Sequence, residues 1–187
     1  MEQFIVSPIR RYYDLELPQL RDKQKCPLLI AMHGYEGDKD SMMLLAREIA
    51  NGKMVVISLQ GPNQFFVAQK TPAKRRVGFG WGTTWKMNES IELHHSNVKD
   101  LIRLSAEEYQ ADAERVFLLA FSQACSYNYR FAFTHPDEIR GVIAVCGGVP
   151  GDWDDNPAYQ RSRTHVFHIA ATEDEWYTRE ANLTVKE

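Results

Sequence analysis

Apolar residues gather in five short runs that recur along the chain with amphipathic segments between them. The runs are Pro27 to Met32, Met54 to Leu59, Val116 to Ala120, Gly141 to Cys146 and His165 to Ala171. Their near-continuous apolar composition, without alternation, is typical of strands buried on both faces of a parallel sheet. We therefore predict five strands in the interior of a layered fold.

The segments between these runs carry apolar residues at the spacing of a helix. Helices are predicted over residues 38–50, 89–111 and 123–134. The apolar stripe of the first holds Met42, Leu45, Ala46 and Ile49, and that of the second holds Ile91, His95, Val98, Ile102, Ser105 and Tyr109. Strands that alternate with helices predict an α/β fold with a doubly wound, mostly parallel sheet. With 187 residues, one domain is expected over 1–187.

Two further segments lie outside this alternation. Phe4 to Ser7 and Tyr12 to Leu17 are predicted to form an antiparallel pair at the edge of the sheet. The stretch from Gln60 to Asn88 holds four glycines and reads as one long irregular loop. A loop of that length within a compact domain is usually functional, and this one follows the strand end where open α/β sheets bind ligands.

Composition and charge exclude several classes of partner. The apolar fraction of 44%, the charged fraction of 25% and a net charge of −3 are ordinary for a soluble globular protein. They give no reason to expect nucleic acid or a membrane surface as a partner. Three cysteines without C-x-x-C spacing argue against a disulfide framework or a thiolate metal site. No stretch resembles a signal peptide or a membrane span, so a cytoplasmic protein is expected.

The most informative local pattern is a serine where an apolar strand gives way to a helix. Ser122 follows the run ending at Phe121 and has alanine two residues away on each side. A tight strand-to-helix turn lifts a serine hydroxyl clear of the sheet and leaves the next N–H free to stabilise an oxyanion. Such a turn needs small residues at both flanks, and alanine is the smallest after glycine. Ser122 is therefore the candidate nucleophile.

Two other strand ends supply pieces of the same chemistry. After the first core strand, His33-Gly34 turns the chain so that the Tyr35 N–H could join the Gln123 N–H as an oxyanion donor. After the last apolar run, Asp174 lies in an acidic turn in the position of a triad acid. The alternative for Asp174 is a cap on a following helix, and Glu173 and Glu175 are its neighbouring alternatives.

Together these segments resemble a known family. The segments H-G-Y-E-G-D, F-S-Q-A, F-T-H-P-D-E-I-R-G-V-I-A-V-C-G-G and A-T-E-D-E-W-Y resemble the carboxylesterase/phospholipase group of the α/β hydrolases, related to the acyl-protein thioesterases. The resemblance runs from about residue 27 to the end of the chain. It implies an α/β-hydrolase fold with Ser122 as nucleophile, Asp174 as triad acid, and Tyr35 and Gln123 as oxyanion donors. It also implies cleavage of short- to medium-chain carboxylic esters without metal or cofactor.

One element of that family pattern has no counterpart here. A serine nucleophile needs a base, which in the family is a histidine after one further strand beyond the acid. The sequence has no histidine after His168 and ends 13 residues beyond Asp174. We expect the C-terminal strand and helix of the fold to be missing; otherwise a histidine comes from elsewhere, or the chain does not catalyse. Of the six histidines, none is a good substitute.

The remaining candidates are aromatic side chains and a thiol. Trp81, from the long loop, and Trp153, after the strand ending near Cys146, are predicted to form opposite walls of the substrate site. Packing within their loops is the alternative. Cys125, three residues after Ser122, is expected to be a buried packing residue and not a rival nucleophile.

The predicted function is that of a serine carboxylesterase forming an acyl-enzyme on Ser122 with a small-molecule ester. The alternative is a hydrolase-fold protein that binds a ligand without catalysis. A sheet without its last strand exposes an edge, so pairing with a second copy is also expected.

Overall fold

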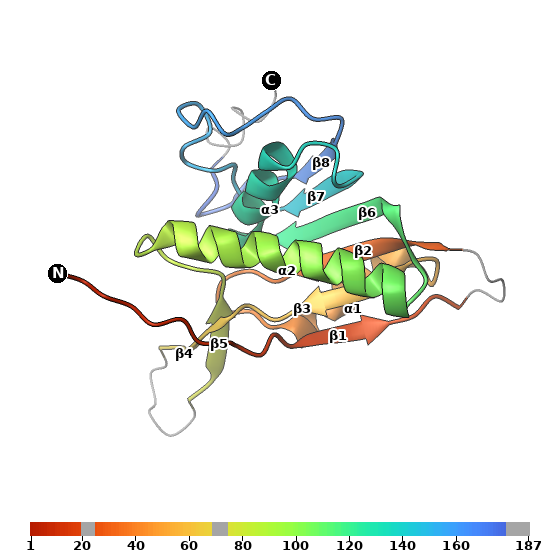
Figure 1. Cartoon of the computed structure of the whole chain (residues 1–187), viewed down its shortest axis with the longest axis horizontal. Helices are drawn as coiled ribbons and strands as arrows, with labels where there is room; N and C mark the ends of the chain where they lie inside the picture. Colours follow the sequence, from red (N-terminus) through yellow and green to blue (C-terminus); the bar gives the residue numbers. More distant parts are fainter. Residues whose placement is uncertain (20–24, 69–74, 179–187) are drawn as a thin grey trace.

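The computed structural model describes residues 1–19, 25–68 and 75–178. A six-stranded sheet runs through it in the order β1-β3-β2-β6-β7-β8 (Figure 1). All neighbouring strands are parallel except β1, which pairs antiparallel with β3. The strands are β1 (Tyr13–Glu16), β2 (Cys26–Met32), β3 (Val55–Leu59), β6 (Ala111–Phe121), β7 (Gly141–Val145) and β8 (His165–Ile169). The predicted mostly parallel α/β sheet is therefore confirmed.

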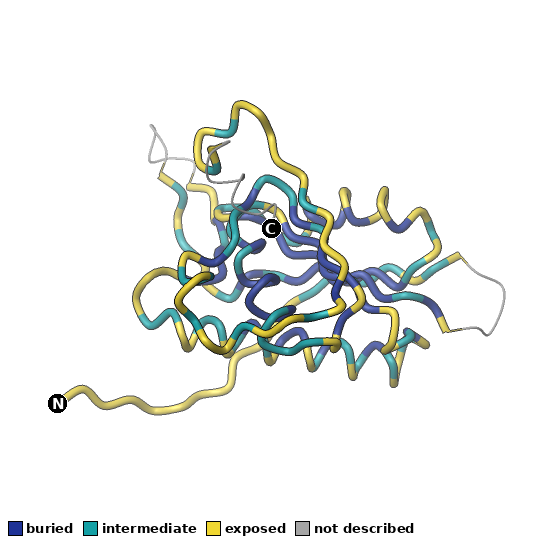
Figure 2. Tube along the Cα trace, turned by 90° about the horizontal axis from the view of Figure 1, so that it is seen from above, coloured by how far each residue is buried: buried dark blue, intermediate teal, exposed yellow. Residues whose placement is uncertain are grey.

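Three helices cover the two faces of this sheet. The helices are α1 (Lys39–Ala50), α2 (Met87–Glu108) and α3 (Gln123–Thr134). The helices α2 and α3 lie on one face and α1 lies on the other (Figure 1). Buried residues follow the sheet through the middle of the molecule (Figure 2), because the parallel strands are covered on both sides. None of the helices in the described ranges is long and apolar enough to cross a bilayer.

Local sequence explains how α1 begins and ends, and where α2 ends. Asp38 caps α1, since its carboxylate accepts a hydrogen bond from the Ser41 N–H at 2.8 Å. Asn51 closes the helix in the left-handed conformation that asparagine tolerates. The helix α2 begins two residues earlier and ends three residues earlier than predicted, because Ala111 already belongs to β6. Its buried stripe consists of His94, Asn97, Val98, Leu101 and Ser105.

Two predictions about the chain outside the sheet's parallel core are wrong. Residues 4–7 form no strand, and Phe4 is exposed; β1 pairs instead with β3, the parallel strand whose free edge it covers. The stretch from Gln60 to Asn88 is not one irregular loop. It contains an antiparallel hairpin of β4 (Asn63–Phe66) and β5 (Val77–Gly80) and the first residues of α2. The hairpin stands below the sheet in Figure 1.

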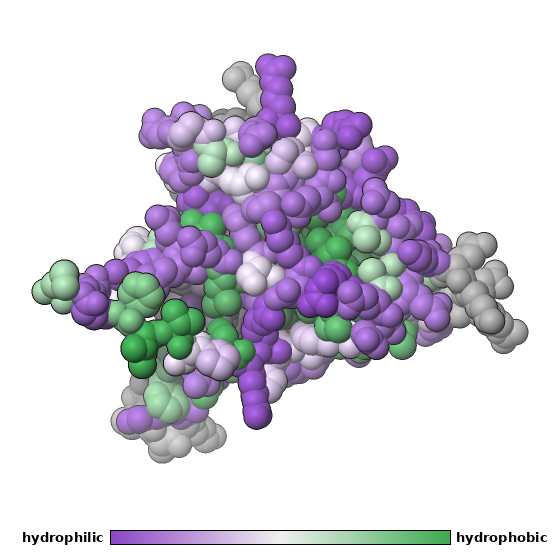
Figure 3. All heavy atoms as spheres, in the orientation of Figure 1, coloured by the Kyte–Doolittle hydropathy of each residue, from purple (hydrophilic) through white to green (hydrophobic). Residues whose placement is uncertain are grey.

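Among the residues that the structure describes, α1 covers only part of the face of the sheet on which it lies. The helix α1 packs on β1, β2 and β3. Farther along the same face, two registered rows of apolar side chains cross β6, β7 and β8: Leu119, Ile143 and Phe167, and Phe121, Val145 and Ile169. Phe167 is 62% exposed and Ile169 is 40% exposed. The opposite face is mostly hydrophilic outside the N-terminal arm, as Figure 3 shows.

Candidate active site

Ser122 occupies the turn between β6 and α3 in a backbone conformation that non-glycine residues rarely adopt. Its φ is 53° and its ψ is −116°. The turn is held from both sides, because the Ser122 N–H donates to the Val145 carbonyl at 2.9 Å and the Ser122 carbonyl accepts from the Cys125 N–H at 3.1 Å. Such a conformation costs on the order of 1–3 kcal/mol and persists only where the surroundings enforce it. Both flanking alanines are fully buried.

The loop after β2 passes directly beside this turn. A Cβ atom on Gly34 would lie 2.8 Å from the Phe121 ring and 3.1 Å from the Ser122 Cβ. Only glycine permits the loop to approach this closely. Beyond it, the Glu36 N–H donates to the Phe79 carbonyl and the Gly37 N–H donates to the Gly34 carbonyl. The Tyr35 peptide thus lies between two anchored neighbours at the edge of the site.

His33 orders this loop as a neutral, buried side chain. Its Nε2 accepts the Gly61 N–H at 2.9 Å, so its Nδ1 carries the proton and donates to the Gly34 carbonyl at 2.7 Å. Burial lowers the pKa of His33, which keeps the ring neutral. His33 is therefore a structural residue of this loop.

The Gln123 side chain joins the serine turn to the segment after β5. Its Oε1 accepts the Trp81 N–H at 3.0 Å, and its Nε2 donates to the Gly82 carbonyl at 2.9 Å. Gln123 is also the first residue of α3, so its own N–H has no acceptor within the helix. Trp81, predicted to be a substrate wall, is 1% exposed and donates its indole N–H to the His33 carbonyl at 2.7 Å. Trp81 therefore supports the His33 loop from inside the core.

A cavity of about 530 Å³ opens beside the serine turn. It is lined by Tyr35, Glu36, Ser122, Gln123, Trp176 and Tyr177. The Tyr35 ring stacks on Phe65 of β4 with ring centroids 4.8 Å apart, so the hairpin supports one wall. The cavity lies at the carboxyl ends of the parallel strands, where open α/β sheets bind ligands.

Asp174 holds the turn that forms the opposite side of this cavity. Its Oδ1 accepts the Trp176 N–H and the Tyr177 N–H, both at 2.9 Å. The hydrogen bond from the Tyr177 N–H, followed by that from the Trp176 N–H, lowers the pKa of Asp174. The carboxylate therefore stays ionised. Trp176 and Tyr177 both reach the cavity, although the sequence analysis assigned them no role. The sequence signal available for this turn was an aspartate, Asp174, two residues before Trp176 and three residues before Tyr177.

The other sequence candidates lie away from the cavity. Trp153 packs on Phe133 and Tyr159, with ring centroids 4.9 and 5.0 Å away, and does not line the cavity. Cys125 is fully buried, and burial raises the pKa of its thiol to about 12. Cys125 is therefore a packing residue, as expected. No histidine is among the six residues that line the cavity.

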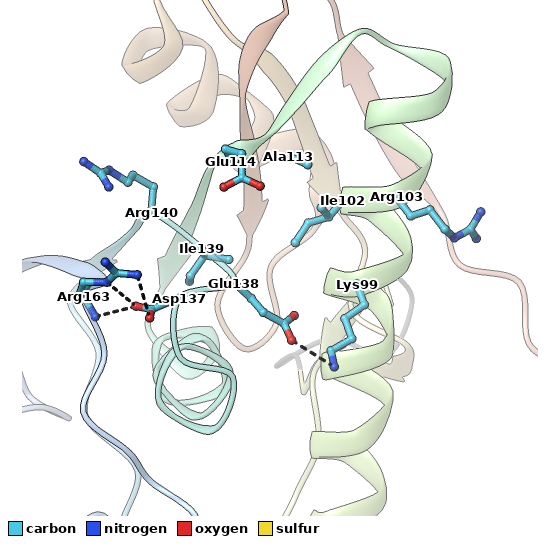
Figure 4. Close-up of a pocket in the computed structure, with 10 residues that line it drawn as sticks. All are labelled: Lys99, Ile102, Arg103, Ala113, Glu114, Asp137, Glu138, Ile139, Arg140 and Arg163. Carbon is cyan, nitrogen blue, oxygen red and sulfur yellow. Dashed lines mark hydrogen bonds and ion pairs between the residues drawn. The ribbon is translucent and has the colours of Figure 1, made fainter.

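A second cavity, of about 580 Å³, lies at the opposite end of the sheet (Figure 4). Arg140, just before β7, and Glu114, near the start of β6, are among its lining residues. Two of its charged pairs are already matched within the wall, Lys99 with Glu138 and Arg163 with Asp137. It contains no serine or cysteine, so the candidate active site is the cavity beside Ser122.

The parallel sheet, the strained serine between β6 and α3, and the glycine loop against it define an α/β hydrolase. The phospholipase/carboxylesterase family model matches residues 19–181, and the chain belongs to that family. A search of curated proteins found no match.

Solved carboxylesterases share the fold at low sequence identity. The carboxylesterase of Bacillus cereus is 17% identical, with a TM-score of 0.68, over 94% of this chain and 77% of that one. A phospholipase/carboxylesterase from Dyadobacter fermentans is 14% identical, with a TM-score of 0.69, over 96% and 81%. A carboxylesterase from Mesorhizobium loti is 18% identical, with a TM-score of 0.66, over 92% and 78%. The resemblance to the carboxylesterase/phospholipase group is thus confirmed.

Proposed function

We propose that the protein is a serine carboxylesterase that cleaves short- to medium-chain esters through an acyl-enzyme on Ser122. The observation that carries this proposal is the backbone of Ser122, held at a φ of 53° in a turn that opens into a cavity. A position with positive φ favours glycine, so a serine there has a role that folding does not require.

In this mechanism the Ser122 Oγ attacks the ester carbonyl. The Tyr35 and Gln123 amides stabilise the oxyanion, the alcohol leaves, and water then releases the acyl group. The cavity volume of about 530 Å³ suits a small ester, and its aromatic walls suit an apolar acyl chain. The substrate is a small molecule, and no cofactor enters the reaction.

The general base is the member of a catalytic triad that the described residues of the cavity do not include. Asp174 directs its carboxylate to two backbone N–H groups of its own turn, and no histidine lines the cavity. These observations favour the second candidate, a hydrolase-fold protein that binds an ester or acid without turnover. Loss of a triad member leaves roughly 10³–10⁴-fold catalysis over water, so even a weak esterase would be measurable.

The test compares the natural chain with Ser122→Ala. Hydrolysis of p-nitrophenyl acetate and p-nitrophenyl butyrate is measured together with fluorophosphonate labelling. We expect slow hydrolysis and a label on Ser122, both absent from Ser122→Ala. A chain that binds the butyrate product but takes no label at Ser122 would instead support the non-catalytic candidate.

A further inference from the structure

The cavity beside Ser122 combines aromatic rings with a carboxylate. Three of the six residues that line it are aromatic, namely Tyr35, Trp176 and Tyr177, and Glu36 is the one acidic or basic residue among the six. Aromatic faces and carboxylates both attract organic cations. We propose that the cavity selects carboxylic esters whose alcohol part ends in an alkylammonium group. This inference rests on the proposed esterase function and names its substrate class.

Glu36 is held in place at the wall formed by the loop after β2. Its backbone has a φ of 65°, and its N–H donates to the Phe79 carbonyl at 2.9 Å. Arg76, just before β5, donates to the Glu36 carbonyl at 2.8 Å and to the Glu36 Oε2 at 3.2 Å. These contacts fix both the backbone and one carboxylate oxygen of Glu36 against the hairpin.

The ion pair with Arg76 leaves Glu36 able to attract a second cation. Arg76 contacts only Oε2, and among the described residues no hydrogen bond or ion pair engages Oε1. The side chains of Arg76 and Glu36 are 50% and 40% exposed, so water screens their attraction. A carboxylate has two oxygens that accept independently. An ammonium group can therefore lie beside Oε1 while Arg76 stays on Oε2.

The opposite wall repeats the combination of rings and acidic residues. Trp176 is 86% exposed, and with Tyr177 it follows Glu173, Asp174 and Glu175 along the chain. The Asp174 carboxylate accepts the N–H groups of both aromatic residues, so it belongs to the turn that carries their rings. Glu173 and Glu175 are exposed on either side of it. Both walls thus favour a positively charged group over a neutral or negative one.

The experiment compares two esters of the same shape. Butyrylcholine and 3,3-dimethylbutyl butyrate differ at one atom, a positively charged nitrogen in the first and a carbon in the second. For each ester, kcat/KM is divided by the rate constant of its hydrolysis by hydroxide, and the ratio of the two quotients is the cation preference. We expect a cation preference of about fivefold or more in the natural chain, the effect of one opposite charge about 4 Å away in water.

Three variants assign this preference to the cavity. Glu36→Gln should lower the cation preference about fivefold. Trp176→Leu should lower it about two- to fivefold, the usual contribution of an exposed ring to binding a cation. Glu48→Gln removes the same charge from the exposed side of α1, away from the cavity, and should keep the natural preference. Because the preference is a ratio within one variant, losses in folding or in general reactivity cancel.

Salt separates charge from shape. Raising NaCl from about 0.01 M to about 1 M shortens the Debye length from about 30 Å to about 3 Å. The cation preference of the natural chain should decrease over this range, and it should decrease less in Glu36→Gln. A preference that depends on shape alone would not respond to salt, and that result would contradict the inference.

Binding to Ser122→Ala, measured by calorimetry with both esters, distinguishes this inference from the function beneath it. Hydrolysis of both esters by the natural chain with a preference near one, or an unchanged preference in Glu36→Gln, would leave the esterase in place and overturn the cation site. Absence of Ser122-dependent hydrolysis, with tighter binding of butyrylcholine that Glu36→Gln abolishes, would overturn the esterase and retain the cation site. Neither hydrolysis nor preferential binding would overturn both.

Discussion

Ser122 combines a strained backbone with the proposed nucleophile. Its φ of 53° favours glycine, yet the proposed mechanism requires a hydroxyl at this position. The hydrogen bonds to Val145 and Cys125 and the fully buried alanines on each side enforce the conformation. The rest of the fold therefore compensates for the backbone strain at Ser122.

Relief of this strain is measurable. Ser122→Gly and Ser122→Ala both lose the hydroxyl, but only glycine fits the backbone without strain. We expect Ser122→Gly to have a free energy of unfolding higher than that of Ser122→Ala by about 1 kcal/mol, after allowing for the flexibility of glycine in the unfolded chain. Urea denaturation followed by tryptophan fluorescence gives both values.

Ser126 provides the matched control within the same helix. It lies in the interior of α3, so there glycine should be less stable than alanine by about 1 kcal/mol. If glycine is also the less stable substitution at position 122, the turn holds no strain.

Sequence alone predicted that Ser122, Tyr35 and Gln123 lie close together, because their positions depend on the order of strand, turn and helix. Ser122, Tyr35 and Gln123 follow strand ends, and parallel strands bring such ends together at one edge. Trp81 could not be placed in this way, because an indole in a glycine-rich segment fits a core and a cavity wall equally well. Tyr177 was missed because its position depends on a capped turn whose direction no residue pattern reports.

At the scale of elements, α2 and α3 meet through histidines that burial keeps neutral. His94 is 1% exposed, and its Nε2 lies 3.1 Å from the Asn128 Oδ1. Burial, followed by the charge of His95, lowers the pKa of His94 to about 3. Burial, followed by His135, Lys99 and Arg130, lowers the pKa of His95 to about 4. Protonation of either ring therefore opposes the folded state.

Because these histidines stay neutral in the folded chain, we expect the free energy of unfolding to decrease in mild acid. The unfolded chain takes up protons on these histidines near pH 6.5, whereas the folded chain does not until about pH 4 or below. Stability is thus fully present above pH 6.5 and falls as the pH drops towards 4. Each histidine contributes about 1.4 kcal/mol per pH unit within this window. Urea denaturation at pH 7, 6, 5 and 4.5 measures the slope.

His95→Gln tests the assignment of this slope. It removes one of these groups and should reduce the slope by about 1.4 kcal/mol per pH unit between pH 6 and 4.5. The matched change at the exposed His165 on β8 should leave the slope as in the natural chain. An unchanged slope in His95→Gln would mean that other groups bind the protons.

The Gln123 side chain anchors the segment that follows the hairpin of β4 and β5. Gln123→Ala removes the acceptor of the Trp81 N–H and the donor to the Gly82 carbonyl. Each lost hydrogen bond costs about 1 kcal/mol, and more where a buried partner is left unsatisfied. We expect lower global stability and faster hydrogen exchange at the Trp81 amide. Gln60→Ala, which alters another amide side chain near His33, should leave exchange at Trp81 unchanged.

Elements with a strong local pattern were predictable, and elements defined by distant partners were not. All five apolar runs became strands. Burial on both faces dictates the apolar composition of four of them, whereas β8 at the edge is mostly exposed. The hairpin was missed because only four residues on each side pair and glycines interrupt one of its strands. The strand β1 was paired wrongly, because an edge strand takes whichever open edge the folded sheet presents.

For the whole molecule, the open side of the sheet is an exposed apolar surface. Phe167 and Ile169 lie on the outer strand β8, and Phe121 lies at the end of β6 on the same face of the sheet. An edge strand with apolar side chains favours pairing with another chain. We therefore expect association between copies through β8.

Matched phenylalanines test this association. Phe167 on β8 and Phe66 on β4 are 62% and 63% exposed, so Phe167→Lys and Phe66→Lys remove equally exposed rings. Sedimentation velocity across a range of concentrations should show less association for Phe167→Lys than for the natural chain. Phe66→Lys should sediment like the natural chain, and equal effects of both variants would contradict an interface at β8.

The two hydrogen bonds of Gln123 also restrict how the site can change its substrate. In the proposed mechanism Gln123 supplies an oxyanion amide, and its side chain anchors the segment after β5, whose hairpin partner β4 supports the Tyr35 wall through Phe65. Under this mechanism, a substitution that reshapes the wall shifts the amide proposed to stabilise the transition state. Variants selected for a new acyl group should therefore change kcat together with KM.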